Sequence, residues 1–281
     1  MKTYVQQIML GTVTGNEAKA RETLRRIKAA GYDGLELNRF MIHPSPLVVR
    51  VLTKAAGMPT GNSGKLDWAS LIRESGLSVV TLHADLGSLE NNLMDVVQDA
   101  RTFNTDTVVI TGMYRFAYNS AKDVTELAER LNKAGRLLKE NGIALLYHNH
   151  NAELLRTDSG TCAYDILIEK TDPDYVNFEF DSYWFTDAGA DAKMWMKKLG
   201  TRMKLWHATD RGARQKGSCM TPILKEDSVE LGTGNMDLAG MLEIAKENGV
   251  SAIVLESHRN WINKDPLSSM ELSAKWLKEN V

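Results

Sequence analysis

Short strand-like runs alternate with amphipathic helix-like stretches from one end of the chain to the other. The stretch Asn16–Ala30, for example, begins with a good N-cap residue and is followed by Gly31, a common helix stop. The strand-like runs are Tyr4–Leu10, Gly34–Asn38, Ser78–His83, Thr107–Thr111, Ile143–His148, Val176–Asp181, Met203–His207 and Ser251–Glu256. This alternation predicts a parallel sheet, because each return to such a sheet needs a crossover helix.

Two parallel architectures compete, an open doubly wound sheet and a closed barrel. The open sheet usually has a glycine-rich first turn, and Leu10–Asn16 lacks that fingerprint. Eight strand units and a closing helix over Pro266–Lys278, within 281 residues, favour a single (β/α)₈ barrel, the TIM barrel. No shift in composition marks a second domain, so residues 1–281 are predicted to form one domain.

One connection is longer than a plain strand-to-helix loop. The segment Arg39–Asp67 contains three prolines and several glycines. Loops at the carboxyl ends of barrel strands build active sites. We therefore interpret this segment as an extended active-site loop with a short helix around Leu47–Ala56.

Composition narrows the classes of function. The formal net charge of −2 provides no basic field for nucleic acid. No apolar run approaches the roughly 20 residues of a membrane span, and Met1–Leu10 lacks the apolar core and cleavage site of a signal peptide. Two cysteines are too few for a disulfide framework. We expect a cytoplasmic protein with neither nucleic-acid nor membrane partners.

Polar side chains gather at the predicted strand ends, where the catalytic groups of such barrels lie. Side chains alternate along a strand, so Glu179 and Asp181 share one face of Val176–Asp181 while two phenylalanines share the other. The apolar face must meet the helices, which turns the polar face into the barrel. The inward groups at the ends of strands five to eight are His148, Asp181, His207 and Glu256.

Four inward imidazole and carboxylate groups are costly to bury unless they are paired or bind a cation. Any one of them alone is more simply a hydrogen-bonded structural residue, but together they predict a shared site for one divalent metal ion. Mixed nitrogen and oxygen ligands suit Mn²⁺, Co²⁺, Zn²⁺, Fe²⁺ or Mg²⁺, and the sequence does not choose among them. Glu179 lies one layer deeper and is interpreted as a supporting residue.

These residues resemble those of the sugar phosphate isomerase/epimerase family, the xylose isomerase-like TIM barrels that also include endonuclease IV. The resemblance covers essentially the whole chain, and its most specific part is the Tyr-His-Asn-His segment Tyr147–His150. Supporting segments are Phe180–Trp184, His207–Asp210, Leu231–Asp237 and Glu256.

In ketose 3-epimerases of this family, Glu, Asp, His and Glu from strands five to eight hold the metal. By position these residues correspond to His148, Asp181, His207 and Glu256, so the first is a departure. Their two glutamates are proposed to move protons on opposite faces of an enediolate, and His148 puts that symmetric mechanism in doubt. The Tyr-His-Asn-His segment resembles a subgroup that includes lyase-like and hydratase-like enzymes acting on keto-sugars.

The resemblance implies a metal-dependent sugar or sugar phosphate isomerase/epimerase. It would act by proton transfer next to a carbonyl, through a metal-bound enediolate. Glu256 and His150 are the candidate general acids and bases, and His148 is either a ligand or a base. A keto-sugar lyase, dehydratase or hydratase on the same scaffold is the alternative. A carbohydrate-binding barrel without activity is an alternative of another class.

Candidate substrate-binding residues follow from the same positions, although each also has a structural interpretation in a loop, the core or a solvated surface. They are Glu36, His83, Glu153, Trp184 and Arg211. The Gly232–Gly234 segment is interpreted first as a tight turn and second as a phosphate cradle. His43 and His258 are interpreted as exposed rather than catalytic.

DNA repair is disfavoured. Endonuclease IV has a second His three residues after the strand-six Asp, where this sequence has Trp184. The expected partner is therefore a small carbohydrate. Related barrels often pair, so a homodimer is one expectation, with the oligomeric state left open.

Overall fold

The computed structural model describes residues 1–44, 63–215 and 217–281. The helix predicted around Leu47–Ala56, and most of the long loop that holds it, lie outside the described residues.

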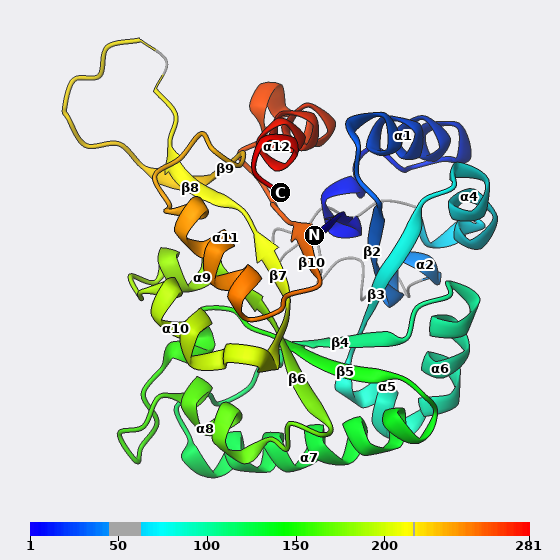
Figure 1. Ribbon diagram of the computed structural model, residues 1–281, viewed down its shortest axis with the longest axis vertical. Coiled ribbons are helices and arrows are strands. Elements are labelled where there is room, and N and C mark those ends of the chain that lie inside the picture. The colour runs from blue at the N-terminus through cyan, green and yellow to red at the C-terminus, as the bar shows by residue number, and fades with distance from the viewer. Residues whose placement is uncertain (45–62, 216) are drawn as a thin grey trace.

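Eight strands form a closed barrel in which every neighbouring pair is parallel (Figure 1). They are β1 (Lys2–Gln6), β2 (Gly34–Asn38), β3 (Ser78–Ala84), β4 (Thr107–Thr111), β5 (Ala144–His148), β6 (Val176–Asp181), β7 (Met203–Ala208) and β10 (Ala252–Leu255). The first and last of these strands pair through Lys2 and Ala252, which closes the barrel. The predicted (β/α)₈ fold is confirmed.

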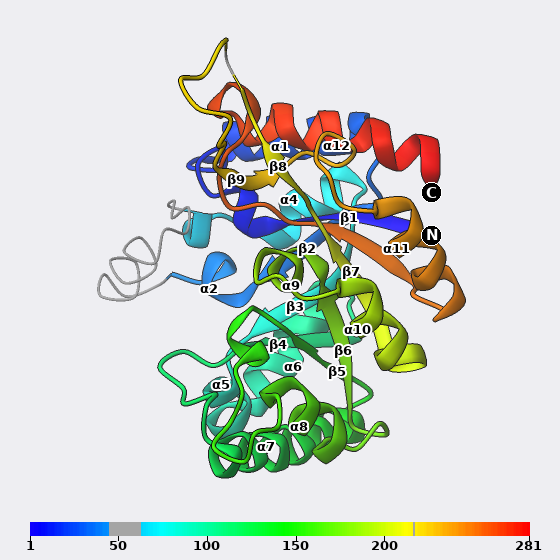
Figure 2. The ribbon, with the colours of Figure 1, turned by 90° about the vertical axis from the view of Figure 1, so that its left-hand side faces the viewer.

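Helices surround this barrel as an outer ring (Figures 1 and 2). The α-helices are α1 (Glu17–Ala30), α2 (Arg39–Ile42), α4 (Trp68–Ser75), α5 (Leu86–Asn91), α6 (Leu93–Thr102), α7 (Ala121–Glu140), α8 (Ala163–Lys170), α9 (Ser182–Asp187), α10 (Ala192–Leu199), α11 (Leu238–Glu247) and α12 (Pro266–Asn280). Short 3₁₀ helices are η1 (Gln7–Leu10), η2 (Ser63–Lys65), η3 (Ala152–Leu154), η4 (Gly200–Arg202) and η5 (Ile262–Lys264). The predicted start and stop of α1 are confirmed: Asn16 accepts a hydrogen bond from the Lys19 amide, and Gly31 adopts a left-handed φ of 97°.

The first strand is shorter than the predicted Tyr4–Leu10, which is a correction. It ends at Gln6, whose side-chain oxygen accepts a hydrogen bond from the Ile8 amide at 3.0 Å and so caps η1. All four residues of η1 are buried, so their apolar character reflects burial in a helical turn rather than in a strand. The last barrel strand ends at Leu255, one residue before Glu256.

A two-stranded antiparallel hairpin, which the sequence pattern did not predict, follows the seventh barrel strand. Its strands are β8 (Asp210–Ala213) and β9 (Glu226–Val229). The connection between them projects from the body as an arm (Figure 1, yellow), and Met220 and Ile223 on it are exposed. Its strands are too short and too polar to show a clear period-two pattern, which is why sequence reasoning missed them.

Two apolar clusters lie on the two sides of the barrel sheet. A small cluster fills the barrel interior and consists of Tyr4, Val109, Leu146, Leu205, Ala252 and Val254. A much larger cluster lies between the sheet and the helices. Above the interior cluster, towards the carboxyl ends of the strands, the inward positions become polar. The ionisable side chains inside the barrel therefore lie at the carboxyl ends of its strands.

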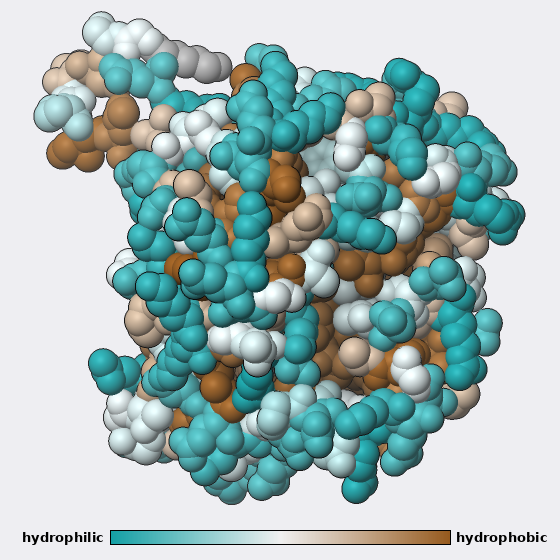
Figure 3. Space-filling model, in the orientation of Figure 1, coloured by the Kyte–Doolittle hydropathy of each residue, from teal (hydrophilic) through white to brown (hydrophobic). Residues whose placement is uncertain are grey.

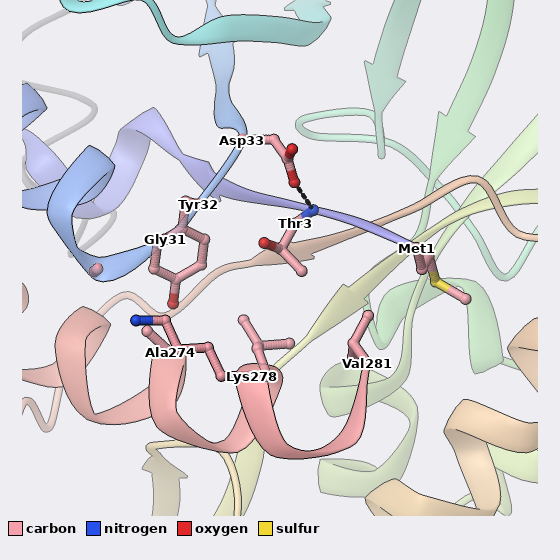
Figure 4. A pocket seen from close by; sticks show the side chains of 10 residues that line it. Met1, Thr3, Gly31, Tyr32, Asp33, Ala274, Lys278 and Val281 are labelled. Atoms are coloured by element: carbon pink, nitrogen blue, oxygen red, sulfur yellow. Dashed lines mark hydrogen bonds between the residues drawn. The ribbon is translucent and has the colours of Figure 1, made fainter.

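The opposite end of the barrel, where Met1 and Val281 lie, carries a separate cavity of about 190 Å³ (Figure 4). Asp33 accepts a hydrogen bond there from the Thr3 amide at 2.8 Å. None of the predicted site residues lines this cavity. The face that carries it is otherwise largely hydrophilic, with apolar side chains visible mainly in its hollows (Figure 3). Among the described residues, no helix is both long and apolar enough to cross a membrane.

Candidate metal centre and active site

The four predicted metal ligands meet at the mouth of the barrel. His148, Asp181 and His207 end or nearly end β5, β6 and β7, and Glu256 follows β10. One nitrogen or oxygen atom from each lies within 4.8 Å of the corresponding atoms of the other three. Residues that are more than a hundred positions apart in the chain therefore converge on one point.

In each of the two histidines of this set, one ring nitrogen contacts a buried carboxylate. Nε2 of His207 lies 2.7 Å from Oε2 of Glu36, and Nδ1 of His148 lies 3.2 Å from Oε2 of Glu179. Their other nitrogens face Glu256 Oε2, at 2.9 Å for His207 Nδ1 and 3.9 Å for His148 Nε2. Metal-binding histidines commonly donate their second ring N–H to a carboxylate, which fixes the ring orientation.

A third histidine joins the two buried carboxylates. Nε2 of His83 lies 3.0 Å from Glu36 Oε2 and 3.1 Å from Glu179 Oε2. Burial opposes a charge on this ring, but the two carboxylates outweigh it and raise the pKa of His83 to about 10. Thr81 and Gln6 donate further hydrogen bonds to Glu36. Below the four predicted ligands, Glu36, His83 and Glu179 therefore form a buried layer that contacts His148 and His207.

Asp181 is oriented by the helix that follows it. One of its carboxylate oxygens, Oδ1, accepts hydrogen bonds from the backbone amides of Tyr183 at 2.8 Å and Trp184 at 3.3 Å, so Asp181 is the N-cap of α9. The side chain of Asn149 donates a hydrogen bond from Nδ2 to the Asp181 carbonyl and accepts one at Oδ1 from the Asp181 amide, both at 3.0 Å. Burial raises the pKa of Asp181 to about 7. A carboxyl group in such a place is stabilised in its ionised form by a cation beside it.

Glu256 divides its two oxygens between different neighbours. Oε2 faces His207 and His148, whereas Oε1 lies 3.6 Å from Nε2 of His258. Although burial opposes ionisation, His258 and His207 hold the pKa of Glu256 well below its usual range. One oxygen is thus placed for a metal and the other for a proton.

Two cavities open onto this point. The larger, of about 590 Å³, is bordered by His83 and His148; the smaller, of about 280 Å³, is bordered by Asp181 and Trp184. Three side chains line both cavities: His150, Glu256 and His258. Trp184 has its ring centre 5.5 Å from that of His150 and 5.9 Å from that of His258. The predicted ligands therefore lie where the two cavities meet.

Two buried polar atoms of the smaller cavity have no hydrogen-bond partner among the residues that the structure describes. They are Oγ1 of Thr209 and Nδ1 of His258. Buried polar groups nearly always find a partner, so an orphaned pair lining a cavity indicates a ligand with hydroxyl groups or ordered water. The expectation that His258 is exposed is wrong, because only 26% of its side chain is accessible. Its position two residues after Glu256 was the available signal.

Not every candidate substrate residue reaches the cavities. His83 and Trp184 line them, whereas Glu36, Glu153 and Arg211 do not. Glu153 is fully buried and accepts hydrogen bonds from the Tyr147 hydroxyl at 2.7 Å and the His150 amide at 3.0 Å. The Arg211 guanidinium is paired with Asp187 and Glu226.

The Gly232–Gly234 segment is the tight turn expected first. The amides of Gly232 and Gly234 donate to Oδ2 of Asp210 at 3.1 and 2.9 Å. These N–H groups are thereby committed to a carboxylate of the protein itself. His43 is exposed, as expected, and lies 2.9 Å from Asp99.

The donor set fits a divalent cation. Ligand bonds of about 2.0–2.2 Å place neighbouring donor atoms about 3–3.5 Å apart, and the distances between Glu256 Oε2 and the two histidines are 2.9 and 3.9 Å. Two neutral imidazoles and two carboxylates also balance the charge of such an ion. The set does not discriminate between the metals that accept mixed nitrogen and oxygen ligands.

Comparison with known families agrees with this geometry. Residues 24–280 match the family model of the xylose isomerase-like TIM barrels. The chain belongs to this family. The resemblance inferred from the sequence is thereby confirmed, and it places the chain in a superfamily of enzymes, while its assignment to a Tyr-His-Asn-His subgroup stays a prediction.

Individual relatives of this xylose isomerase-like barrel carry several activities. An inosose dehydratase of Clostridium perfringens is 30% identical over 163 residues, which is 55% of this chain and 54% of the relative, so the alignment spans about half of each. A solved structure of a sugar phosphate isomerase/epimerase from Parabacteroides distasonis superposes with a TM-score of 0.77 at 21% identity, covering 99% of this chain and 93% of that one. A structure described as the IOLI protein with a bound zinc atom superposes with a TM-score of 0.65 at 16% identity, covering 100% and 98%.

Proposed function

We propose that this protein is a metal-dependent dehydratase that removes water from a small polyhydroxylated ketone. Loss of water is the alternative outcome of the chemistry expected from sequence, and the inosose dehydratase relatives support it over isomerisation. The observation that carries the choice is the environment of His148, which occupies the position of the first glutamate in the ketose 3-epimerases. Its Nδ1 lies 3.2 Å from Glu179, and its side chain is 3% exposed.

A histidine held in this way is fixed as a ligand and is not free to exchange protons with a substrate. Of the four predicted ligands, Glu256 then remains as the proton-transfer group, through the oxygen that faces His258. A single carboxylate base suits removal of one proton followed by elimination. Epimerisation needs a second base on the opposite face of the same carbon.

His148, Asp181, His207 and Glu256 would hold the cation, which supplies Lewis-acid stabilisation of negative charge on the carbonyl oxygen. The protein's own residues do the rest. Glu256 Oε1 takes the proton from the carbon next to the carbonyl, and the C–H electrons form the enediolate. Burial lowers the pKa of His150 to about 3, so its imidazole is neutral and can pass a proton on but not supply one. The C–O bond to the hydroxyl on the next carbon then breaks, and that hydroxyl leaves as water with the proton that Glu256 took, relayed through His150. One substrate gives one unsaturated ketone and one water, without a co-reactant.

An isomerase/epimerase is the second candidate, and it was the first expectation from sequence. His150 favours it, because this imidazole lines both cavities together with Glu256 and gives the site a second proton-transfer group. If the two groups face opposite sides of one carbon, the same enediolate can be reprotonated instead of losing a hydroxyl.

One experiment separates the two candidates. The metal-loaded protein is incubated with inosose and with ketohexoses in D₂O, and the products are followed by NMR and ultraviolet absorbance. The dehydratase predicts an absorbing unsaturated ketone that has lost the hydrogen next to the carbonyl. Deuterium in an epimer or isomer without that absorbance supports the second candidate. If no compound either exchanges a proton or loses water, both candidates fail.

A further inference from the structure

The two halves of the barrel contribute different kinds of side chain to the lining of the larger cavity. The metal-facing residues come from the ends of β5, β6, β7 and β10. In the other half of the barrel, the ends of β1 to β4 contribute the polar residues Gln6, Asn38, His83 and Thr111. The segments that follow these strands contribute Arg39, Asp85 and five apolar side chains. These side chains are Ile8, Phe40, Leu86, Met113 and Tyr114, and we call them the apolar wall.

The apolar wall is continuous with the metal site. The cavity that it borders is also lined by His148, His150 and Glu256. Ile8 and Leu86 are 2% and 1% exposed and form its base, whereas Tyr114 is 71% exposed and stands at its outer side. A polyhydroxylated ketone alone can bury only its C–H faces against this wall, because hydroxyl groups cover the rest of its surface.

The volumes of the two cavities also favour a substrate that is larger than a single sugar ring. Ligand cavities for drug-sized molecules measure roughly 300–1,000 Å³. The smaller cavity, at about 280 Å³, lies just below that range and suits one sugar ring; it holds Trp184 and the unpartnered atoms of Thr209 and His258. The larger cavity, at about 590 Å³, has room for a second group.

A phosphate is a poor occupant of the larger cavity. Of the described residues that line the two cavities, Arg39 and Arg259 carry guanidinium groups. Nε of Arg39 lies 2.7 Å from Asp99, and Nε of Arg259 lies 3.0 Å from Asp227. Both charges are already compensated, so this part of the lining provides no unpaired cation for a phosphoryl group.

We propose that the substrate is a keto-sugar bearing an uncharged apolar or aromatic substituent, with its sugar ring in the smaller cavity and its substituent against the apolar wall. This inference rests on the proposed function, because it assumes that the sugar is bound at the predicted metal site. It narrows that function from free or phosphorylated sugars to substituted ones, such as aryl glycosides whose sugar ring also carries a ketone.

The test compares matched ligands on the metal-loaded protein by isothermal titration calorimetry. The ligands are phenyl and methyl β-D-glucopyranoside, the corresponding phenyl and methyl β-D-galactopyranosides, and glucose 6-phosphate. The glycosides lack the ketone, so they cannot react, and they report only how the ring and its substituent bind. Burying a phenyl ring predicts at least about 10-fold tighter binding of a phenyl than of the matching methyl glycoside. The double variant Met113→Ala/Tyr114→Ala should lose most of that preference. Met94→Ala is the matched control, because Met94 is 57% exposed and lines neither cavity.

Equal affinity for phenyl and methyl glycosides, absence of binding by every phenyl glycoside, tighter binding of glucose 6-phosphate, or an unchanged preference in the double variant would overturn the proposal. Proton exchange into an unsubstituted ketose in D₂O is measured on the same preparation. If that exchange occurs without a preference for phenyl glycosides, this inference fails while the proposed function stands. If neither the ketose nor a phenyl-substituted keto-sugar exchanges a proton or loses water, the proposed function fails as well.

Discussion

The imidazole Nδ1 of His207 lies 2.9 Å from Oε2 of Glu256, although the two residues are 49 positions apart in the chain. His207 lies in β7, and Glu256 directly follows β10, the strand that pairs with β7. This contact joins two of the four predicted ligands at the mouth of the barrel. The opposite nitrogen of the same ring is held by Glu36. His207 therefore connects the buried carboxylate layer to the surface on which a substrate would bind.

Replacing Asp181 with Asn should remove metal binding and leave the fold intact. The amide oxygen of Asn can still cap α9, so helix stability is kept, but the charge that a cation needs is lost. Metal content by elemental analysis and thermal unfolding of the variant check this. Asp181→Ala is the comparison, and it should lose the cap as well, at a cost of about 0.5–2 kcal/mol. Full metal content in Asp181→Asn would remove Asp181 from the ligand set.

The Glu36→Gln substitution should weaken metal binding about 10- to 100-fold, because a carboxylate behind a ligating histidine fixes its orientation and raises its basicity. Glu36 lines neither cavity, so the Michaelis constant for the substrate should change less than the metal affinity does. A competition titration with a chelator measures the metal affinity. A variant with unaltered affinity for the metal would show that the Glu36–His207 contact has no such role.

Exchanging His150 for Ala should lower kcat by about 10²- to 10⁴-fold, the contribution typical of a general acid or base, while metal content stays unchanged. The readouts are turnover and elemental analysis on the same sample. Loss of metal together with activity would instead assign His150 to the metal site.

Gly112 leaves no room for a side chain. A Cβ atom there would lie 2.6 Å from Glu153 Oε1, 3.1 Å from the Tyr118 hydroxyl and 3.2 Å from His150 Nδ1. Gly112→Ala should therefore destabilise the protein by about 1–3 kcal/mol and reduce kcat by displacing His150. Gly15→Ala is the matched control, since a Cβ atom at Gly15 would meet no other group within 4 Å. Similar unfolding free energies for the two variants would contradict this prediction.

Acid should weaken the fold through Glu230. Burial opposes ionisation of this carboxyl group, but Arg214 and Ser269 lower its pKa below the ordinary value. A lowered pKa stabilises the folded state above the unfolded pKa of about 4.3, and that contribution is lost as the pH falls through the folded pKa. The Tm difference between the protein and Glu230→Gln should thus be largest near pH 7 and shrink towards pH 3. A pH-independent difference would exclude the effect.

The barrel and the convergence of the four predicted ligands could be foreseen because each follows from a local regularity. Alternating strands and helices imply parallel pairing, and alternation within β6 turns Asp181 inward with Glu179 below it. How deep each inward side chain lies in the barrel was harder to predict. Glu36 also ends an inward-facing strand, but its contacts with His207 and His83 on other strands make it a supporting residue rather than a cavity residue.

Other parts depended on contacts that no sequence pattern encodes. Glu153 lies beside the Tyr-His-Asn-His segment but folds back onto Tyr147 and the His150 amide. The cap that Gln6 provides for η1 ended the first strand early. The apolar wall is assembled from four separate connections, so its members could not be grouped before the barrel was known.

X-ray diffraction at the absorption edge of the bound metal, on crystals of the purified protein, tests the central claim most directly. We predict a single anomalous peak that contacts His148, Asp181, His207 and Glu256. A peak elsewhere, such as between Glu36 and His83, or no peak in metal-saturated crystals, would contradict the account.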